Sequence, residues 1–139
     1  MVEKKYVDVN VFIYWLSGSG ELMNRAKNWI TKVEKGERGE YLTSVLTVYE
    51  ALVIISGLTG HTLKDRGFVE EIINAFFELE RLVFVPLTRD IVKDSLFFMK
   101  RFNLDFEDAI HYATARKHRA KKIITNDKDY LRTDIKPIF

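Results

Sequence analysis

The 139-residue sequence contains no cysteine, which excludes disulfide bonds, zinc sites built on thiolates and a cysteine nucleophile. It also lacks an apolar run of the roughly 18 residues that a membrane-spanning helix needs. The charged N-terminus is not followed by the apolar segment of a signal peptide. We therefore expect a protein of the cytoplasm that has no membrane-spanning segment.

The chain carries little net charge, because 22 Lys and Arg against 20 Asp and Glu leave only +2. Its overall charge therefore does not by itself indicate a nucleic-acid partner. A hydrophobic content of 47% at this length indicates a single domain, residues 1–139, with a real core. Basic residues concentrate in residues 116–122. They suit the C-terminus of a helix, and they could also form an edge that contacts phosphates through Arg116 and Arg119; the two interpretations are compatible.

Short apolar segments typical of strands alternate with longer segments of helical periodicity. The expected strands cover residues 5–7, 41–44, 81–86, 122–125 and 134–138, and the expected helices cover residues 10–16, 22–33, 46–58, 68–79, 88–102 and 105–118. This order predicts a three-layer α/β/α sandwich with a mainly parallel sheet of four to five strands. Such a sheet binds ligands at the carboxyl ends of its strands, which right-handed crossovers place along one edge. The segment 57–67 is expected to form a protruding hairpin between two helices.

Asp8 interrupts an apolar run, between the first expected strand and the apolar helical turn over residues 10–16. A carboxylate at such a place loses much of its hydration, which is costly unless it is paired or binds a metal. No cation follows within reach along the chain. Asp8 therefore needs a partner from elsewhere in the sequence.

Three more acids follow strands or begin helices at equivalent places. Glu50 lies in the first turns of the helix after the second strand, Asp108 in the first turn of the helix over residues 105–118, and Asp127 directly after the strand over residues 122–125. Because strand ends and helix starts meet at one edge of a parallel sheet, the four acids are expected to converge on one crevice.

Each of these three acids also has an ordinary structural interpretation. Glu50 fits a capping box that begins at Thr47, and Asp108 fits the first turn of a helix capped by Asp105. The pair at residues 126–127 is typical of a turn. His111, three residues after Asp108, is expected to be a partly buried histidine with satisfied hydrogen bonds rather than a substrate ligand. Only the joint occurrence of the acids favours a site.

Converging acids would require a counter-ion. Two carboxylates about 5 Å apart repel by about 3 kcal/mol at an effective dielectric constant near 20. Protons or a metal must then neutralise them. All candidate ligands are oxygen atoms, a donor set that suits Mg²⁺ or Mn²⁺ rather than structural zinc.

Four segments together resemble the PIN domains found as toxins in VapBC toxin–antitoxin pairs. They are residues 7–13 (VDVNVFI), 43–50 (TSVLTVYE), 104–115 (LDFEDAIHYATA) and 123–130 (IITNDKDY), which occur in family order over nearly the whole chain. The ordered set is specific, although no single segment is.

The resemblance implies a Mg²⁺-dependent single-strand endoribonuclease, with Mn²⁺ as a possible substitute, that acts as the toxin of such a pair. It implies that metal binding and catalysis fall to the acids introduced above: Asp8, Glu50, Asp108 and Asp127. Asn10, Thr125 and Asn126 would orient carboxylates or substrate, Asp105 would be an auxiliary acid or the helix cap, and Lys128 would contact RNA with Arg116 and Arg119. The implied partners are single-stranded or structured RNA, a second copy in a homodimer, and a small antitoxin whose tail occupies the acidic groove.

Two other functions remain open from the sequence. One is phosphoryl transfer through an aspartyl phosphate on Asp8, although no lysine follows a late strand in the setting that this chemistry needs. The other is a catalytically silent PIN-like module that binds RNA or protein, against which the intact acids argue.

Overall fold

The computed structural model describes residues 2–139 and has one five-stranded sheet at its centre. Its strands are β1 (Lys5–Val7), β2 (Tyr41–Ser44), β3 (Val83–Val85), β4 (Lys122–Ile124) and β5 (Lys136–Ile138). They lie in the order β3-β2-β1-β4-β5, and every neighbouring pair is parallel. The prediction of a mainly parallel sheet of four to five strands is confirmed.

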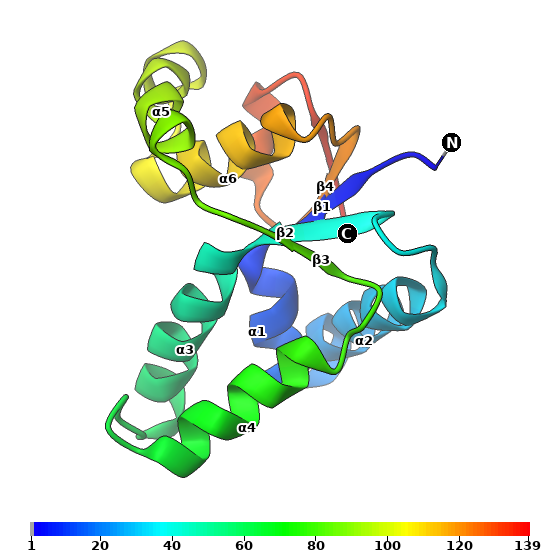
Figure 1. The fold of residues 1–139 in the computed structure, drawn as a ribbon, viewed down its shortest axis with the longest axis vertical. Coiled ribbons are helices and arrows are strands. Elements are labelled where there is room, and N and C mark those ends of the chain that lie inside the picture. Colours follow the sequence, from blue (N-terminus) through cyan, green and yellow to red (C-terminus); the bar gives the residue numbers. More distant parts are fainter. Residues whose placement is uncertain (1) are drawn as a thin grey trace.

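Helices cover both faces of this sheet (Figure 1). They are α1 (Val9–Ser17), α2 (Gly20–Lys35), α3 (Val45–Thr59), α4 (Arg66–Phe77), α5 (Arg89–Phe102) and α6 (Phe106–Lys117), with a short 3₁₀ helix, η1 (Lys128–Arg132), before β5. Helices α1 to α4 lie on one side of the sheet, and α5 and α6 lie on the other. The predicted three-layer α/β/α sandwich is confirmed.

The strands are apolar on both faces because each face is covered by helices. Val7 and Ile124 pack into the core beneath α1 to α4, whereas Tyr6 and Ile123 pack into the core beneath α5 and α6. Val7 lies opposite Ile124 and Tyr6 lies opposite Ile123 across β1 and β4. The two pairs are one position apart and therefore point to opposite faces of the sheet. The central strands are thus fixed from both sides, and their carboxyl ends are held in place.

Strand β2 passes directly into α3, so the helix begins earlier than the expected capping box requires. The cap is Ser44, whose hydroxyl accepts a hydrogen bond from the Leu46 N–H at 3.1 Å. Thr47 instead bonds the Thr43 hydroxyl at 2.8 Å. The interpretation of Glu50 as part of a capping box begun by Thr47 is therefore wrong.

Other boundaries differ by a few residues from those expected. Strand β3 covers only residues 83–85 of the expected 81–86, and η1 was not predicted. The segment 57–67 joins α3 to α4 at the end of an arm that extends away from the sheet (Figure 1). Gly60 ends α3 at φ 75°, a left-handed conformation that glycine adopts without strain. None of the helices within residues 2–139 has both the length and the apolar character needed to cross a membrane.

Candidate metal centre

Asp8 lies at the carboxyl end of β1 and caps α1. Its side chain is only 4% exposed, and both of its oxygens accept hydrogen bonds. Oδ1 accepts from the Val9 N–H at 2.8 Å, and Oδ2 accepts from the Thr125 hydroxyl at 2.7 Å. Burial raises the pKa of Asp8, while the nearby His111 and these hydrogen bonds oppose that rise. The carboxylate is therefore held rigidly but remains costly to ionise.

Thr125 connects the end of β4 to two of the expected site residues. Its hydroxyl oxygen accepts hydrogen bonds from Asn10 Nδ2 at 3.1 Å and from the Asp127 N–H at 3.0 Å. The Oδ1 atom of Asn10 is buried and has no hydrogen-bond partner among residues 2–139. Asn126, by contrast, is exposed and reaches only the Tyr14 hydroxyl, at 3.5 Å. Asn10 and Thr125 thus belong to the hydrogen-bond network around Asp8, and Asn126 does not.

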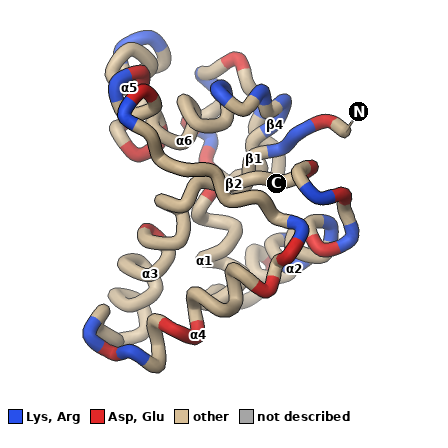
Figure 2. Tube along the Cα trace, viewed as in Figure 1, with Lys and Arg blue, Asp and Glu red and all other residues tan. Residues whose placement is uncertain are grey.

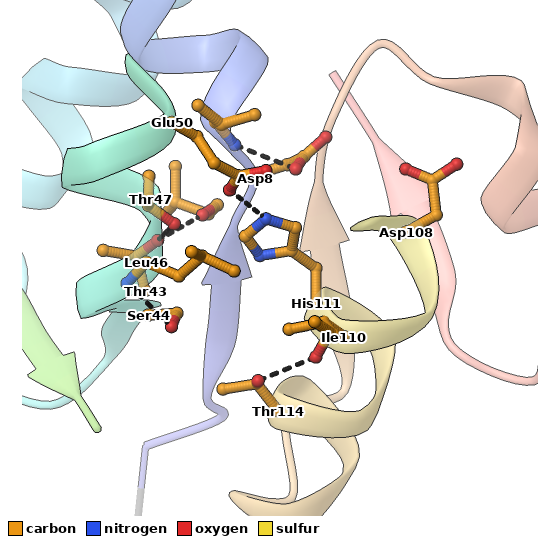
Figure 3. Close-up of polar contacts among 12 residues, drawn as sticks. Asp8, Thr43, Ser44, Leu46, Thr47, Glu50, Asp108, Ile110, His111 and Thr114 are labelled. Atoms are coloured by element: carbon orange, nitrogen blue, oxygen red, sulfur yellow. Dashed lines mark hydrogen bonds and ion pairs between the residues drawn. The ribbon is translucent and has the colours of Figure 1, made fainter. Parts of the chain in front are cut away.

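Glu50 has a buried partner that sequence reasoning missed. Its Oε1 atom lies 2.5 Å from Nε2 of His111, whose Nδ1 lies 2.5 Å from the Tyr6 hydroxyl. His111 is 1% exposed and Glu50 is 9% exposed. Figure 3 shows the His111 ring reaching from α6 toward Glu50 on α3, with Asp8 close by. The other carboxylate oxygen of Glu50, Oε2, is buried without a hydrogen-bond partner in the described chain.

This pairing determines the charge of His111. Burial opposes a charged imidazole, but the Tyr6 oxygen, the bond to Glu50 and the charge of Asp8 outweigh it and raise the pKa of His111 well above 6.5. The charged form of His111 is thus favoured, with its ring bonded to Glu50 and Tyr6 and with Asp8 nearby. The expectation that His111 has satisfied hydrogen bonds is confirmed, but the residue is fully rather than partly buried, and its role as the partner of Glu50 was not foreseen.

Asp108, Asp127 and Asp129 form a second, more open group. Each offers one carboxylate oxygen, and these oxygens all lie within 4.8 Å of one another. Burial raises the pKa of Asp108 to about 7, and the charges of Asp127, Asp105, Asp8 and Asp129 add to this rise. Asp129 was not among the expected residues. The only signal for it in the sequence was its position two residues after Asp127.

The four expected acids therefore divide into two pairs. Asp108 and Asp127 meet in the open cluster, whereas Asp8 and Glu50 lie outside its 4.8 Å limit. Asp8 is nevertheless near enough for its charge to raise the pKa of Asp108, and Glu50 likewise raises the pKa of Asp8. The acids form one electrostatically connected centre.

Little positive charge neutralises this centre. Arg132 pairs with Asp129 at 2.6 Å, and within residues 2–139 no Lys or Arg lies within 4.0 Å of the carboxylates of Asp8, Asp108 or Asp127. The donors are all oxygen atoms, and three of them converge. Such a set suits a hard divalent cation, Mg²⁺ or Mn²⁺, and the residues present therefore fit that group.

The remaining expected residues lie at different distances from the acids. Asp105 caps α6 and accepts a hydrogen bond from the Asp108 N–H at 2.8 Å. Lys128 begins η1 directly after Asp127. Arg116 and Arg119 lie at and beyond the C-terminal end of α6, the end opposite Asp108, and Arg116 pairs there with Asp134 at 3.0 Å. The structure does not bring these two arginines next to the acids.

Comparison with known proteins gives one family match and several similar structures. The sequence profile of the PIN domain matches residues 5–136. No curated protein sequence gives a significant match. Three solved structures share the fold at low sequence identity. The first is a toxin–antitoxin complex from Klebsiella pneumoniae, with 22% identity over 91% of this chain and 90% of that chain and a TM-score of 0.62.

The second is VapC20 from Mycobacterium tuberculosis, a toxin that cleaves the sarcin–ricin loop, with 16% identity over 96% of this chain and 100% of that chain and a TM-score of 0.74. The third is FitAB bound to a DNA fragment, with 17% identity over 96% and 93% of the two chains and a TM-score of 0.70. At these identities the similarity concerns the fold.

Proposed function

This chain belongs to the PIN domain family, and we propose that it is a Mg²⁺- or Mn²⁺-dependent endoribonuclease that hydrolyses single-stranded RNA. The observation that carries this proposal is the convergence of three carboxylate oxygens within 4.8 Å beside two further buried acids. Such a concentration of negative charge, with a single arginine paired to it, would repel an RNA phosphate unless a cation were bound.

Asp108, Asp127 and Asp129 would hold the cation, with the charge of Asp8 close behind them. When bound, a divalent cation lowers the pKa of a coordinated water and neutralises charge on the phosphate. The protein itself holds the surrounding carboxylates in fixed positions. Asp8 is fixed by two hydrogen bonds, and Asp127 is fixed because its carboxylate accepts the Asp129 N–H at 2.8 Å.

Glu50 is the residue that we expect to receive the proton of the attacking water. Its Oε1 atom is bound to His111, which fixes the carboxylate, and its buried Oε2 atom lacks a hydrogen-bond partner in the described chain, an acceptor that a water in the site would satisfy. In-line attack on phosphorus would leave a 5′-phosphate and a 3′-hydroxyl, and no covalent intermediate on the enzyme is required.

The aspartyl-phosphate alternative agrees less well with the surroundings of Asp8. A nucleophilic carboxylate needs an accessible oxygen, but Asp8 is 4% exposed and both of its oxygens already accept hydrogen bonds. A catalytically silent binding module would not need the acids and is separated from the proposed enzyme by the cleavage assay below.

The partners that we propose are a small antitoxin and a second copy of the chain. The antitoxin is supported by the fold shared with a toxin–antitoxin complex. The homodimer is supported by large exposed apolar side chains on α3 and α5, which a monomer in water would leave uncovered: Tyr49, Val53, Leu58, Leu96 and Phe97. Light scattering of the purified chain, alone and with Leu96→Asp, tests the dimer.

The test of the activity is cleavage of single-stranded RNA with Mg²⁺, with EDTA and with Asp127→Asn. Asparagine keeps the cap of η1 but removes a ligand charge, so cleavage should be lost while the fold remains. Asp90→Asn, an exposed acid in the first turn of α5, is the matched control and should cleave normally. Cleavage that persists in EDTA, or in Asp127→Asn, would contradict the proposal.

A further inference from the structure

Helix α6 carries an acidic site at one end and a basic surface at the other. Asp108 lies in its first turn, and Arg116 and Lys117 lie in its last turn. At a rise of 1.5 Å per residue, the Cα atoms of Asp108 and Lys117 are separated along the helix axis by about 14 Å, and Arg119 follows beyond that end. The basic end therefore belongs to a different part of the surface from the acidic centre.

We name this surface the basic rim and define it by the cations where α6 leads into β4: Lys4, Arg116, Lys117, Arg119 and Lys121. Figure 2 shows Lys and Arg gathered there, beside the N-terminal strand. The Lys121 N–H donates to the Lys4 carbonyl at 2.8 Å, which holds the N-terminal residues against the loop. Besides its own burial, the charges of Lys4 and Lys117 lower the pKa of His118, so positive charges are close together here.

Most of the charge of the rim is uncompensated. Arg116 pairs with Asp134 at 3.0 Å. Within residues 2–139, Lys117, Arg119 and Lys121 have no acidic partner within 4.0 Å, although all three side chains are exposed. Cations that lie together without carboxylates repel one another, and a bound polyanion relieves that repulsion.

Arg119 occupies a backbone conformation that favours glycine. Its φ is 61°, and it follows the end of α6 where the Ala120 N–H bonds the Ala115 carbonyl at 2.9 Å. Helices commonly end in this way, usually with glycine at the left-handed position because a Cβ atom there is strained. The Arg119 guanidinium makes no hydrogen bond within the described chain. Neither packing nor internal bonding therefore accounts for an arginine at this position.

We propose that the basic rim is a second RNA contact, which binds the phosphodiester backbone of the substrate strand away from the bond that is cleaved. This inference rests on the proposed ribonuclease function. Arg116, Arg119 and Lys121 line an open hollow of about 380 Å³ together with Asp134, whose charge is paired with Arg116. Arg119 and Lys121 remain there to contact a phosphate backbone. Because the rim and the acidic centre lie at opposite ends of α6, only a strand long enough to span both benefits from it.

The composition of the rim favours nucleic acid over an acidic protein segment. Protein interfaces have apolar residues at their centre, but no large apolar side chain is exposed between residues 107 and 130, a segment that the structure describes completely. A surface of exposed cations without an apolar centre is the electrostatic footprint of backbone binding.

The test uses Arg119→Gly in the full-length protein with Mg²⁺. Glycine adopts the φ of 61° without strain, so the variant should be at least as stable as the wild type. KM and kcat are measured for single-stranded RNAs of about 4 and about 16 nucleotides, the range of site sizes in single-strand binding proteins. Two variants serve as controls. Asn103→Gly replaces the other non-glycine residue with positive φ without changing charge, and Arg66→Ala removes a cation from the exposed start of α4.

Loss of one phosphate contact should reduce the slope of log KM against log salt concentration by about 0.7 for the longer RNA. KM for this RNA should therefore rise roughly threefold at low salt and less at moderate salt. Adding Lys117→Gln and Lys121→Gln should raise KM by about tenfold or more, with kcat and the shorter RNA unaffected. An unchanged KM for the longer RNA would overturn the inference. Equal changes of KM for both RNAs would also overturn it. The same holds if a polyglutamate peptide competes with RNA and loses more affinity than RNA does in Arg119→Gly.

Binding of the longer RNA to Asp127→Asn, followed by fluorescence anisotropy, separates the two proposals. If the wild type cleaves neither RNA, the proposed activity fails, but weaker binding on adding Arg119→Gly would still support the rim. If the wild type cleaves and the Arg119→Gly substitution leaves both KM and binding unchanged, only the rim fails.

Discussion

The two sides of the acidic centre differ in whether the protein supplies partners for their carboxylates. On the buried side, Asp8 accepts two hydrogen bonds and Glu50 is paired with a cationic histidine. On the open side, Asp108 and Asp127 face each other and Asp129 within 4.8 Å, and only Asp129 has an arginine beside it. Apart from Oε2 of Glu50, the oxygens of the buried carboxylates have hydrogen-bond partners in the protein, whereas Asp108 and Asp127 have no Lys or Arg within 4.0 Å, among the residues that the structure describes, to balance their charge.

This difference separates two requirements of a metal-dependent site. The buried side keeps its geometry without a cation, because its hydrogen bonds are internal to the fold. The open side is repulsive until a cation arrives, and the pKa of about 7 for Asp108 reflects that repulsion together with burial. We infer that the open side determines metal affinity and that the buried side determines the position of the acids that act on substrate.

The largest effect should come from the open side. Asp108→Asn removes one of the converging carboxylates and should lower cleavage about 10³-fold, since metal-ion catalysis contributes several kcal/mol to the barrier. In metal-free protein the same change should raise the free energy of unfolding by about 1 kcal/mol, because it relieves repulsion. Urea unfolding in EDTA and a cleavage assay measure the two effects. Lower stability of this variant without metal would contradict the comparison.

On the buried side the loss of a partner should cost both stability and activity. His111→Asn keeps an amide near Tyr6 but leaves Glu50 buried without its donor, which should cost about 3 kcal/mol of unfolding free energy. Cleavage should fall by about 10- to 100-fold, as when a residue that orients a metal-site ligand is lost.

His111→Gln is the matched variant, because its longer side chain places an N–H near the position of Nε2. It should restore much of the stability and activity that His111→Asn loses. Urea unfolding, kcat and Mn²⁺ affinity by calorimetry are measured for both variants. Equal losses in the two variants would show that His111 acts through packing alone and not through the bond to Glu50.

Without metal, the open side should also make stability depend on pH. The pKa of Asp108 rises from 3.8 to about 7 on folding, so the folded protein holds this proton more tightly than the unfolded chain. The stabilisation that this proton gives the folded protein is complete below pH 3.8 and is lost as pH rises to about 7. Because Asp108 is only partly buried, solvent screening limits the loss to about 2 kcal/mol.

Thermal unfolding in EDTA at several pH values measures how steeply stability falls with pH, and Asp108→Asn should reduce that fall. The raised pKa values of Asp8 and Glu107 should leave a remainder of the same sign. The lowered pKa of Asp134 has the opposite sign but acts below its ordinary value of 3.8, outside this window. The raised pKa of His111 acts above 6.5. An identical slope in Asp108→Asn between these limits would assign the pH dependence to another group.

Local patterns in the sequence were sufficient for the sheet and for part of the centre. β1 and β2 have the bounds expected from their short apolar runs, and Asp8 was identified because its apolar neighbours leave a carboxylate without water. These features depend on residues next to one another along the chain. Strand β3 was overestimated, because Leu82 is buried in the loop before the strand and Pro86, which has no N–H to donate to the ladder, follows its end.

The features of the centre that the sequence did not predict depend on contacts between residues far apart in the chain. Glu50 and His111 are 61 positions apart, and their bond exists because α3 and α6 both begin at the carboxyl edge of the sheet. No periodicity in either helix indicates that pairing. Asp129 was overlooked for another reason: an acid in a polar turn resembles a solvated residue, and only the fold of η1 brings it near Asp108.

The smallest effect should come from Asp105, which stands at the start of the helix that carries both Asp108 and His111. It caps α6 through the Asp108 N–H at 2.8 Å, and its charge also raises the pKa of Asp108. Asp105→Ala removes the cap and should lower the unfolding free energy by about 1 kcal/mol. Asp105→Asn keeps the cap and removes only the charge. It should therefore leave stability unchanged, lower the pKa of Asp108 in an NMR titration and preserve cleavage within a fewfold range. A loss of cleavage in Asp105→Asn as large as that in Asp108→Asn would instead make Asp105 an acid of the open side, and the division between the two sides would have to be redrawn around it.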